Sequence, residues 1–346
     1  MQKKLTLSEI ATMAGVTSST VSRALNPATV HLLSRKTSER ILSLCDRVGY
    51  RPSLLARGTA TGRTYKVAMI LHSMEKDLNA HDWNRITCAT SAFLQEYGYS
   101  LVLLRTSAKG TPMDIQVSNF LMSSIADAYI ASPSMLQNNT SDILHNLKSP
   151  LVVICEQGVP FQFSDGVLRS DADAFREVWL RIPRDMHGKI CFFSTMSNDQ
   201  DRLLNNISQT AWDLGIDAKK AVSSLPFERN SKVPAMEYAE AYHQAKKRSK
   251  SLNKFDFIWC TSDFVALGVR DALIESGRHP GKDVFILGYG DLETFPGVSE
   301  NPVLSTISAN TNEIARNICK IIMRKLKGEQ ANIITVKSTF IARSTF

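Results

Sequence analysis

The chain carries two different hydrophobic patterns, one after the other. From Lys66 onward, short apolar runs alternate with longer stretches in which apolar residues recur at helical spacing. The runs predict strands at Val67–Leu71, Leu101–Leu104, Ala128–Ala131, Leu151–Cys155, Ile190–Phe193, Phe255–Cys260 and Val284–Leu287. The stretches between them predict helices near residues 83–97, 113–124, 139–147, 171–186, 199–214, 235–248 and 263–276. Alternating strands and helices form parallel sheets with helices on both faces, and this many units predict two Rossmann-like α/β lobes rather than one.

The residues ahead of these strands show helical spacing only. Gly15 can enter a left-handed turn, so it predicts the end of a first helix that Thr6 or Ser8 caps. Thr17 and Ser34 are suitable N-caps for a second and a third helix. The apolar positions expected to form their shared core are Ile10, Ala11, Ala14, Val21, Ala24, Leu25, Ile41, Leu42, Leu44, Cys45 and Val48. Two short helices joined by a tight turn and closed by a third helix predict a helix-turn-helix domain.

The charge of the chain is concentrated at this helical end. The 346 residues are enough for two or three domains, and their net charge is +8. Residues 1–66 hold eleven Lys and Arg against three Asp and Glu, whereas the rest of the chain holds thirty of each sign. A basic segment alone is more often a solvated face or a tail. A basic segment that also folds as a helix-turn-helix indicates a double-stranded nucleic acid partner.

Several classes of protein do not fit this composition. With 43% apolar and 21% charged residues, the chain is predicted to be globular rather than disordered. No apolar run approaches the roughly 18 residues that span a bilayer, and the N-terminus lacks the apolar core of a secretory signal, so we expect a cytoplasmic protein. The six scattered cysteines form no C-x-x-C pair, and no Walker A, G-x-S-x-G or H-E-x-x-H motif occurs. We therefore expect no metal, no cofactor and no enzymatic activity.

Two motifs near the N-terminus are specific enough to indicate a family. Ala11 to Asn26 reads A-T-M-A-G-V-T-S-S-T-V-S-R-A-L-N, and Gly49 to Thr64 reads G-Y-R-P-S-L-L-A-R-G-T-A-T-G-R-T. Both runs resemble the DNA-binding head of the LacI/GalR family of bacterial transcription regulators, and the resemblance extends to the run I-A-R-S-T at 341–345. It implies an all-α helix-turn-helix head and an α/β body of two Rossmann-like lobes, similar to a periplasmic binding protein.

The resemblance also implies how the chain is divided. Residues 1–52 are expected to form the DNA-binding domain, 53–65 a hinge helix and linker, and 66–346 an effector-binding and dimerisation domain. The expected first lobe is about 66–168 and 303–329, and the expected second lobe is about 169–302 and 330–346. Chain crossovers are then expected near 168, 302 and 329. The implied function is that of a sequence-specific DNA-binding repressor in the bacterial cytoplasm, on the nucleoid.

The expected DNA contacts lie on the second helix and on the hinge. Small hydroxyl side chains at the start of a helix can bond phosphates, and Arg23 is long enough to reach a guanine edge. The family's hinge, here 53–60, folds on operator DNA and wedges a Leu into the minor groove; Thr59 stands at that position, and Leu55 is the alternative wedge. The residues expected to contact DNA are Thr6, Leu7, Thr17, Ser18, Ser19, Thr20, Ser22, Arg23, Asn26, Ser34, Thr37, Tyr50, Ser53, Leu55, Ala56, Arg57 and Thr59. Because one head buries too little surface for specific binding, we expect a homodimer on palindromic double-stranded operator DNA.

The expected effector site lies between the lobes, where side chains follow the carboxyl ends of strands. The candidates are His72, Ser73, Trp83, Ser132, Glu156, Arg202, Ser262, Asp263 and Asp291. Sugar-responsive members of the family typically use an Arg and an Asp at positions held here by Leu203 and Gly290, with Arg202 one residue away. This implies a small polar metabolite, which is a sugar, sugar derivative or polyol-like compound but not a standard hexose, while Arg202 could equally hold an anion. For each candidate, a packing or surface role is the alternative.

Two other functions are compatible with the body alone. A solute-binding receptor of a transport system has the same two lobes, and an enzyme could use the same doubly wound fold. The basic head and the missing secretory signal argue against the receptor, and the missing catalytic motifs argue against the enzyme. For a regulator, the effector either releases the protein from DNA or acts as a corepressor.

Overall fold

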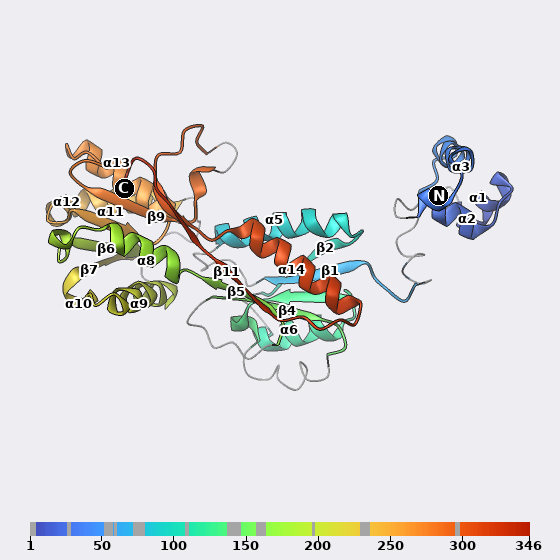
Figure 1. Ribbon diagram of the computed structural model, residues 1–346, viewed down its shortest axis with the longest axis horizontal. Coiled ribbons are helices and arrows are strands. Elements are labelled where there is room, and N and C mark those ends of the chain that lie inside the picture. The colour runs from blue at the N-terminus through green and yellow to red at the C-terminus, as the bar shows by residue number, and fades with distance from the viewer. Residues whose placement is uncertain are drawn as a thin grey trace. The chain divides into compact units, whose positions relative to one another are not determined.

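The computed structural model describes residues 5–25, 29–51, 58, 61–71, 80–107, 111–136, 147–156, 164–195, 198–228, 236–294 and 298–346. The chain divides into two compact units, the head (Met1–Tyr65) and the body (Lys66–Phe346). Figure 1 draws both units, with the head in blue.

The head is a helix-turn-helix closed by a third helix. Its elements are α1 (Leu7–Ala14), α2 (Ser18–Ala24), a 3-10 turn η1 (Val30–Leu32) and α3 (Arg35–Arg47). Their buried side chains form one core, made of Ile10, Ala11, Ala14, Val21, Ala24, Ile41, Leu44, Cys45 and Tyr50. The predicted helices are confirmed, but Leu42, which was expected in the core, is 39% exposed. Leu42 follows the buried Ile41, and one residue along a helix is a rotation of about 100°, which turns its side chain outward.

Side-chain caps fix where these helices begin. The Glu9 amide donates to the Thr6 hydroxyl (3.3 Å) and the Thr6 amide donates to the Glu9 carboxylate (2.7 Å), so Thr6, not Ser8, caps α1 in a capping box. Gly15 ends α1 with a φ of 62°, a left-handed conformation that favours glycine. The hydroxyls of Thr17 and Ser34 accept the amide three residues on, at 3.3 and 3.2 Å. These caps therefore fix the first residue of each of the three helices.

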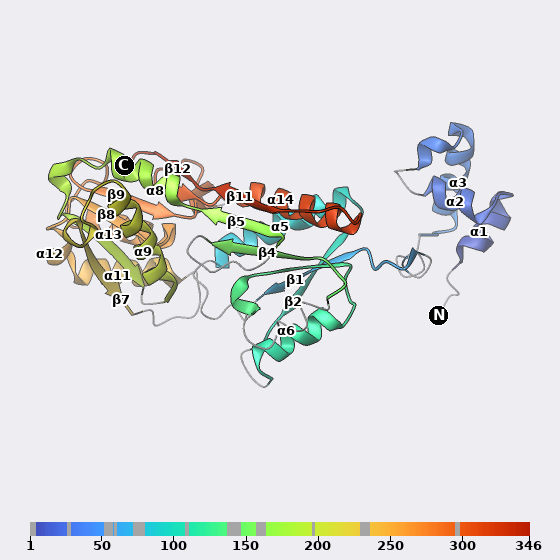
Figure 2. The same ribbon diagram turned by 60° about the horizontal axis from the view of Figure 1, so that its bottom comes forward.

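The first lobe of the body is a parallel sheet with the strand order β11-β5-β4-β3-β1-β2. Its strands are β1 (Lys66–Leu71), β2 (Ser100–Arg105), β3 (Ala128–Ala131), β4 (Leu151–Glu156), β5 (Gly166–Ser170) and β11 (Ile333–Lys337). Its helices are α5 (Ala80–Glu96), α6 (Met113–Met122), α14 (Thr311–Leu326) and the 3-10 turn η2 (Pro133–Met135). In Figures 1 and 2, α5 and α14 lie side by side over one face of this sheet and α6 covers the other.

The second lobe is a sheet with the order β12-β10-β9-β8-β6-β7, in which only the pairing of β12 is antiparallel. Its strands are β6 (Ile190–Thr195), β7 (Val222–Phe227), β8 (Phe257–Cys260), β9 (Phe285–Tyr289), β10 (Ser305–Ser308) and β12 (Thr339–Ile341). Its helices and 3-10 turns are α8 (Ala172–Arg181), η3 (Arg184–Met186), α9 (Asn198–Asp213), α10 (Ala218–Ala221), α11 (Glu237–Lys247), α12 (Ser249–Leu252), α13 (Asp263–Glu275) and η5 (Leu292–Thr294).

Helices cover both faces of the second sheet, which explains the continuous apolar runs in its central strands. Phe192 and Phe193 are neighbours on β6, and successive strand residues point to opposite faces. Phe192 packs with Trp179 of α8, and Phe193 lies in the cluster that holds Leu273 of α13. The prediction of an α/β body of two lobes is confirmed.

The lobe boundaries differ from the sequence prediction at two places. β10 belongs to the second sheet and β11 to the first, so residues 303–329 are not all in the first lobe and residues 330–346 are not all in the second. The crossovers expected near 302 and 329 were therefore wrong; they lie after Ser308 and at Ser338, while the first crossover lies at Asp171. These boundaries were misplaced because the local sequence did not reveal the two strands: β10 reads S-T-I-S, and β11 is a half-exposed edge strand. Residues 139–146 of a predicted helix lie outside the described residues.

Polar side chains tie the three crossovers together. The Ser338 hydroxyl, at the third crossover, donates to the carboxylate of Asp171 at the first. At the second crossover, Asn310 has a φ of 50°, and its side-chain amide donates to the Lys337 carbonyl (2.6 Å) and the Thr339 hydroxyl (2.9 Å). The connections between the lobes thus form one hydrogen-bonded hinge. Within the described ranges, no helix is long and apolar enough to cross a membrane.

Candidate DNA-binding surface and interlobe cluster

Helix α2 turns one face into the head and the other to solvent. Val21 and Ala24 are buried in the core, whereas Ser19, Ser22 and Arg23 are exposed. The Thr17 hydroxyl lies 2.9 Å from the hydroxyl of Ser19 and 2.9 Å from that of Thr20, so the small polar side chains at the helix start form a hydrogen-bonded group. The predicted recognition surface is therefore a polar, outward face with one long cation, Arg23.

The acidic residues of the head are all used inside it. Residues 1–66 contain three acids, of which Glu9 belongs to the capping box. Glu39 binds Arg35 at 2.7 Å, and Asp46 binds Arg51 at 2.7 Å. Among the described residues of the head, no carboxylate pairs with the exposed Arg23, so the outward face of α2 carries a positive charge. Such a surface attracts a polyanion.

The other predicted DNA contacts are placed as follows. Thr6 and Ser34 are exposed helix caps, and Thr37 and Ser18 are half-buried next to caps. Leu7 packs against the head core, and Tyr50 is a buried member of that core, so packing accounts for both. The predicted contacts that lie outside the described residues are Asn26, Ser53, Leu55, Ala56, Arg57 and Thr59.

In the body, charged side chains from both lobes meet where the strands of the first sheet end. We call these residues the interlobe cluster; they are Asp82, Arg85, Glu156, Arg169, Asp171, Arg202 and Tyr289. Glu156, the last residue of β4, binds Arg202 of α9 with 2.8 Å between Oε2 and Nη2. Two predicted effector residues from opposite lobes are therefore brought together, in a direct ion pair.

Arg169 is the buried cation of the interlobe cluster. Its guanidinium binds Glu156 (2.9 Å) and Asp82 (3.1 Å), and its Nε lies 3.7 Å from the carboxylate of Asp171. Burial by itself lowers the pKa of Arg169, but the carboxylates of Glu156, Asp171 and Asp82 and the nearby Tyr289 outweigh it and raise the pKa above its usual value. One charged group thus holds three acids, of which Asp82 and Asp171 are buried and Glu156 is partly exposed.

Asp82 is the acid most affected by this burial. Desolvation raises the pKa of Asp82 to about 6, and the opposing charge of Arg169 limits the rise. Only Oδ2 of Asp82 binds Arg169; Oδ1 is buried and has no hydrogen-bond partner among the described residues. A buried acceptor in this state can take a hydroxyl from a ligand or from water.

Further contacts link the lobes around Arg169. Arg85 of α5 donates to the backbone carbonyls of Gly290 (2.8 Å) and Asp291 (3.3 Å) in the second lobe. The Tyr289 hydroxyl donates to Asp171 at 3.0 Å, and its ring lies 5.6 Å from the guanidinium of Arg169. Charged groups of the first lobe therefore bind both side chains and backbone of the second.

Two predicted effector residues maintain the second lobe itself. The Ser262 hydroxyl caps α13 and donates to Glu237 (3.1 Å). Asp263 is fully buried and accepts hydrogen bonds from the Thr306 hydroxyl and the Leu292 amide, both at 2.6 Å. Burial raises the pKa of Asp263 to about 7 although both bonds lower it. Its Oδ1 lies where a Cβ on Gly288 would be, so packing accounts for the glycine at this position.

The remaining effector candidates lie outside the interlobe cluster or outside the described residues. Asp291 has a φ of 55° and binds Arg343 at 2.6 Å. Trp83 on α5 and Ser132 after β3 are half-buried, and His72 and Ser73 lie outside the described residues. No group of three His, Cys, Asp or Glu suited to a metal ion occurs in the part of the chain that the structure describes.

Sequence reasoning missed the residues that organise the cluster, above all Arg169. Arg169 lies in β5, a strand whose run G-V-L-R-S is interrupted by the arginine itself. Arg85 and Asp171 lie in or next to helices and read as ordinary surface charges. The sequence contained one indication of this residue, a single Arg at the end of a short apolar run. A charge is buried in a sheet only when it is paired, so an Arg in such a run indicates a buried ion pair.

Comparisons with known proteins agree with this architecture. Residues 6–53 match the family described as "Bacterial regulatory proteins, lacI family", and residues 185–346 match "Periplasmic binding protein-like domain". The regulator PtxS of Pseudomonas putida is 22% identical over 99% of this chain and 96% of its own length. The repressor PurR of Actinobacillus pleuropneumoniae is 23% identical over 93% of this chain and 91% of its own length.

Solved structures share the fold of the whole chain. The Lac repressor bound to ONPG has a TM-score of 0.72 at 18% identity, over 99% of this chain and 100% of that one. The regulator CelR in complex with cellobiose has a TM-score of 0.60 at 20% identity, over the same shares.

A basic helix-turn-helix head joined to a body of two α/β lobes defines a DNA-binding transcription regulator with a ligand-binding domain. More specifically, its head matches the lacI family of bacterial regulatory proteins, and the second part of its body matches the periplasmic binding protein-like domain. Its curated relatives regulate transcription, so it stands with regulators and not with the enzymes that use doubly wound folds.

Proposed function

We propose that the chain is a transcriptional repressor whose hold on DNA is controlled by a small polar metabolite bound between the lobes. It acts as a homodimer on a palindromic operator, on the nucleoid in the bacterial cytoplasm. The Lac repressor, which shares the fold, has been solved as a dimer bound to operator and the anti-inducer ONPF, which supports the proposal by analogy.

The observation that carries the DNA-binding part is the outward face of α2. Ser19 and Ser22 are short donors beside an exposed Arg23, in a head whose acids are all engaged. Hydroxyls and helix amides bond phosphates and set the register, while a guanidinium reads the two acceptors of guanine in the major groove. Two heads double the buried surface and the number of bases read, which favours a palindrome.

The ion pair between Glu156 and Arg202 supports the ligand part. Glu156 is held by two guanidiniums, the buried Arg169 of its own lobe and the more exposed Arg202 of the other lobe. A ligand with an acidic group takes Arg202, and Glu156 remains compensated by Arg169. The open oxygen of Asp82 accepts a hydroxyl. The ligand class is therefore a hydroxylated acid, such as a sugar acid, rather than a plain hexose.

Ligand binding and lobe coupling are then one event. When Arg202 turns from Glu156 to the ligand, one of the direct links between the lobes is lost, and the equilibrium between lobe arrangements shifts. A shift of this kind changes DNA affinity only if DNA binding also distinguishes the arrangements, and the coupling is then reciprocal. The ligand is an inducer or a corepressor according to which arrangement it favours.

Selection from a randomised duplex library tests the DNA-binding part. The full chain is expected to enrich one palindromic sequence. Arg23→Ala is expected to cost on the order of 1–3 kcal/mol and to relax the preference at one base pair of each half-site. Arg47→Ala is the matched control, because it also removes one exposed positive charge from a helix of the head. Equal base preferences in the two variants, or no enriched sequence, contradict the assignment.

Calorimetry with paired sugars tests the ligand part. Each neutral hexose is compared with the acid made by oxidising it, with the wild type and with Arg202→Gln. We expect the acid to bind more tightly than the neutral sugar and to lose about tenfold in affinity with Arg202→Gln, which is about 1.4 kcal/mol. Tight binding of a plain hexose or its glycoside rejects this ligand class. Metabolite binding without any selected DNA would favour a transport receptor instead.

A further inference from the structure

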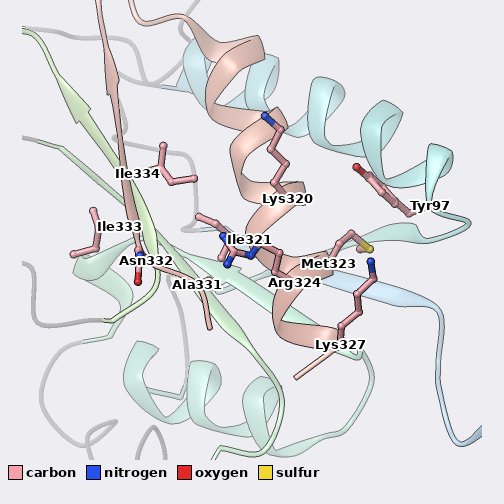
Figure 3. A pocket seen from close by; sticks show the side chains of 10 residues that line it. All are labelled: Tyr97, Lys320, Ile321, Met323, Arg324, Lys327, Ala331, Asn332, Ile333 and Ile334. Carbon is pink, nitrogen blue, oxygen red and sulfur yellow. The ribbon is translucent and has the colours of Figure 1, made fainter. Parts of the chain in front are cut away.

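A pocket lies in the first lobe, away from the interlobe cluster. Its volume is about 490 Å³, and it opens between the second half of α14 and the segment that leads into β11 (Figure 3). Tyr97, just after α5, lies at one side of it. None of its lining residues belongs to the interlobe cluster, so it is separate from the proposed effector site.

The pocket combines an apolar floor with a cationic rim. Ile321 and Ala331 are buried, and Ile333 stays 43% exposed although it is a large apolar side chain. The rim holds Lys320, Arg324 and Lys327, and the lining contains no Asp or Glu. Just outside, Glu329 pairs with Arg324 at 3.4 Å, but both side chains are at least half exposed, so this pair is weak.

Stabilisation of the helix end accounts for Arg324, which lies in the last turn of α14, but not for all of these cations. Basic residues in the last turn of a helix interact favourably with its dipole, an effect confined to that turn. Lys320 lies well before the end of α14 at Leu326. The last carbonyls are also already bonded, because those of Arg324 and Lys325 accept the amides of Lys327, Gly328 and Glu329. The rim is therefore a positive surface beside an apolar one, and among the described residues only the exposed pair of Glu329 with Arg324 offsets its charge.

We propose that this pocket binds an organic anion with an apolar body. An aromatic or acyl group lies on the floor formed by Ile321, Ala331 and Ile333. A carboxylate or phosphate lies against Lys320, Arg324 and Lys327. The pocket has the size of a small-molecule site, and its charge selects against a neutral compound of the same shape.

The two walls of the pocket give such a ligand a route to the hinge. α14 begins directly after the crossover at Asn310, and β11 ends directly before the crossover at Ser338. A ligand that bridges the two elements restricts how they move relative to one another. The pocket is thus a second ligand site that acts on the same crossovers as the interlobe ligand.

The dye 8-anilinonaphthalene-1-sulfonate, an aromatic anion, tests the proposal with the full chain. Its fluorescence is expected to rise and saturate. Lys320→Ala/Arg324→Ala is expected to weaken binding about tenfold, which is about 1.4 kcal/mol. N-phenyl-1-naphthylamine has the same aromatic body without the sulfonate, and its binding should not change in this variant. Lys247→Ala/Lys250→Ala removes the same charge from exposed positions on α11 and α12 and should not weaken the anionic dye.

A second variant tests the apolar floor. Ile333→Asp places a like charge under the anion and should abolish dye binding, whereas Ile115→Asp, at a position 44% exposed on α6, should not. Displacement of the dye by naphthoate or by naphthyl phosphate identifies which acid the rim prefers. The proposal is overturned if binding does not saturate, if both double variants weaken it equally, if the neutral dye loses as much, or if Ile333→Asp binds normally. Loss with Arg202→Gln instead would place the dye in the interlobe cluster and would also overturn it.

Discussion

Replacing Arg169 by methionine tests whether one buried cation holds the interlobe cluster together. The guanidinium is only 8% exposed and contacts Asp82 and Glu156 at 3.1 and 2.9 Å. Methionine fills a similar volume without the charge. Removal of one partner from a buried ion pair typically costs about 3–5 kcal/mol, because the other charge is left uncompensated.

Two features of the cluster decide where in this range the cost falls. Glu156 is 24% exposed and keeps its bond to Arg202, so its charge remains compensated. Asp82 can take up a proton, since burial already raises its pKa to about 6 and Arg169 is what keeps it from rising further. Below about pH 6, Asp82 is largely protonated with or without Arg169, so that part of the penalty disappears. We therefore expect a cost of about 3 kcal/mol at pH 8 and a smaller cost at pH 5.

Urea unfolding followed by tryptophan fluorescence measures this cost, because all four tryptophans lie in the body. Lys337→Met is the control: its ion pair with Asp173 is 70% exposed on the lysine side and should cost less than about 1 kcal/mol. Adding Asp82→Asn to Arg169→Met should recover part of the loss, because no acid then remains buried at that position. The reasoning fails if the cost at pH 8 is below about 1 kcal/mol, if it is the same at pH 5, or if Asp82→Asn recovers nothing.

Three further predictions concern protonation, DNA affinity and helix capping. The pKa of Asp82 is about 6 in the folded chain, against an ordinary pKa of 3.8, so the stability that its proton contributes is lost as the pH rises from about 4 to 6. The difference in the free energy of unfolding between wild type and Asp82→Asn, measured with urea, should therefore change by about 2–3 kcal/mol between pH 4 and pH 7. A difference that stays constant over this range would contradict the prediction. DNA affinity measured by fluorescence anisotropy should fall steeply with salt, with a log–log slope of about −0.9 per phosphate neutralised, and a flat titration would argue against the head as the contact surface. Thr17→Ala removes the cap of α2 and should cost about 1 kcal/mol, seen as faster amide exchange in α2, whereas Thr12→Ala, inside α1, should leave α2 unchanged.

The sequence predicted best where local chemistry decides the structure. Thr6, Gly15, Thr17 and Ser34 mark the helix ends of the head because each satisfies backbone groups within its own turn. Central strands such as β6 and β8 were predicted because burial on both faces requires continuous apolar residues. Edge strands β7, β11 and β12 face solvent on part of their surface and carry no such run, so they were missed.

Burial of charge is the part that the sequence did not reveal. β5 and β10 are internal strands, yet Arg169 in the one and Ser305 and Thr306 in the other interrupt their apolar pattern. These side chains are buried only because partners far along the chain meet them, Asp82 for Arg169 and Asp263 for Thr306. Ser262 and Asp263 were predicted at an effector site for the same reason: their position after a strand was visible, but their partners inside the lobe were not.

The unequal burial of the two arginines on Glu156 explains why a cross-lobe contact can also be a ligand site. Arg169 is fixed by three carboxylates, and two of them, Asp82 and Asp171, are as deeply buried as Arg169 itself. Arg202 is 32% exposed, so solvent or a ligand can replace Glu156 as its partner at modest cost. The exchangeable member of the pair is therefore the one that belongs to the other lobe. Under the proposed function, a ligand that replaces Glu156 on Arg202 breaks a link between the lobes, and a contact that strengthens that link weakens the binding of such a ligand.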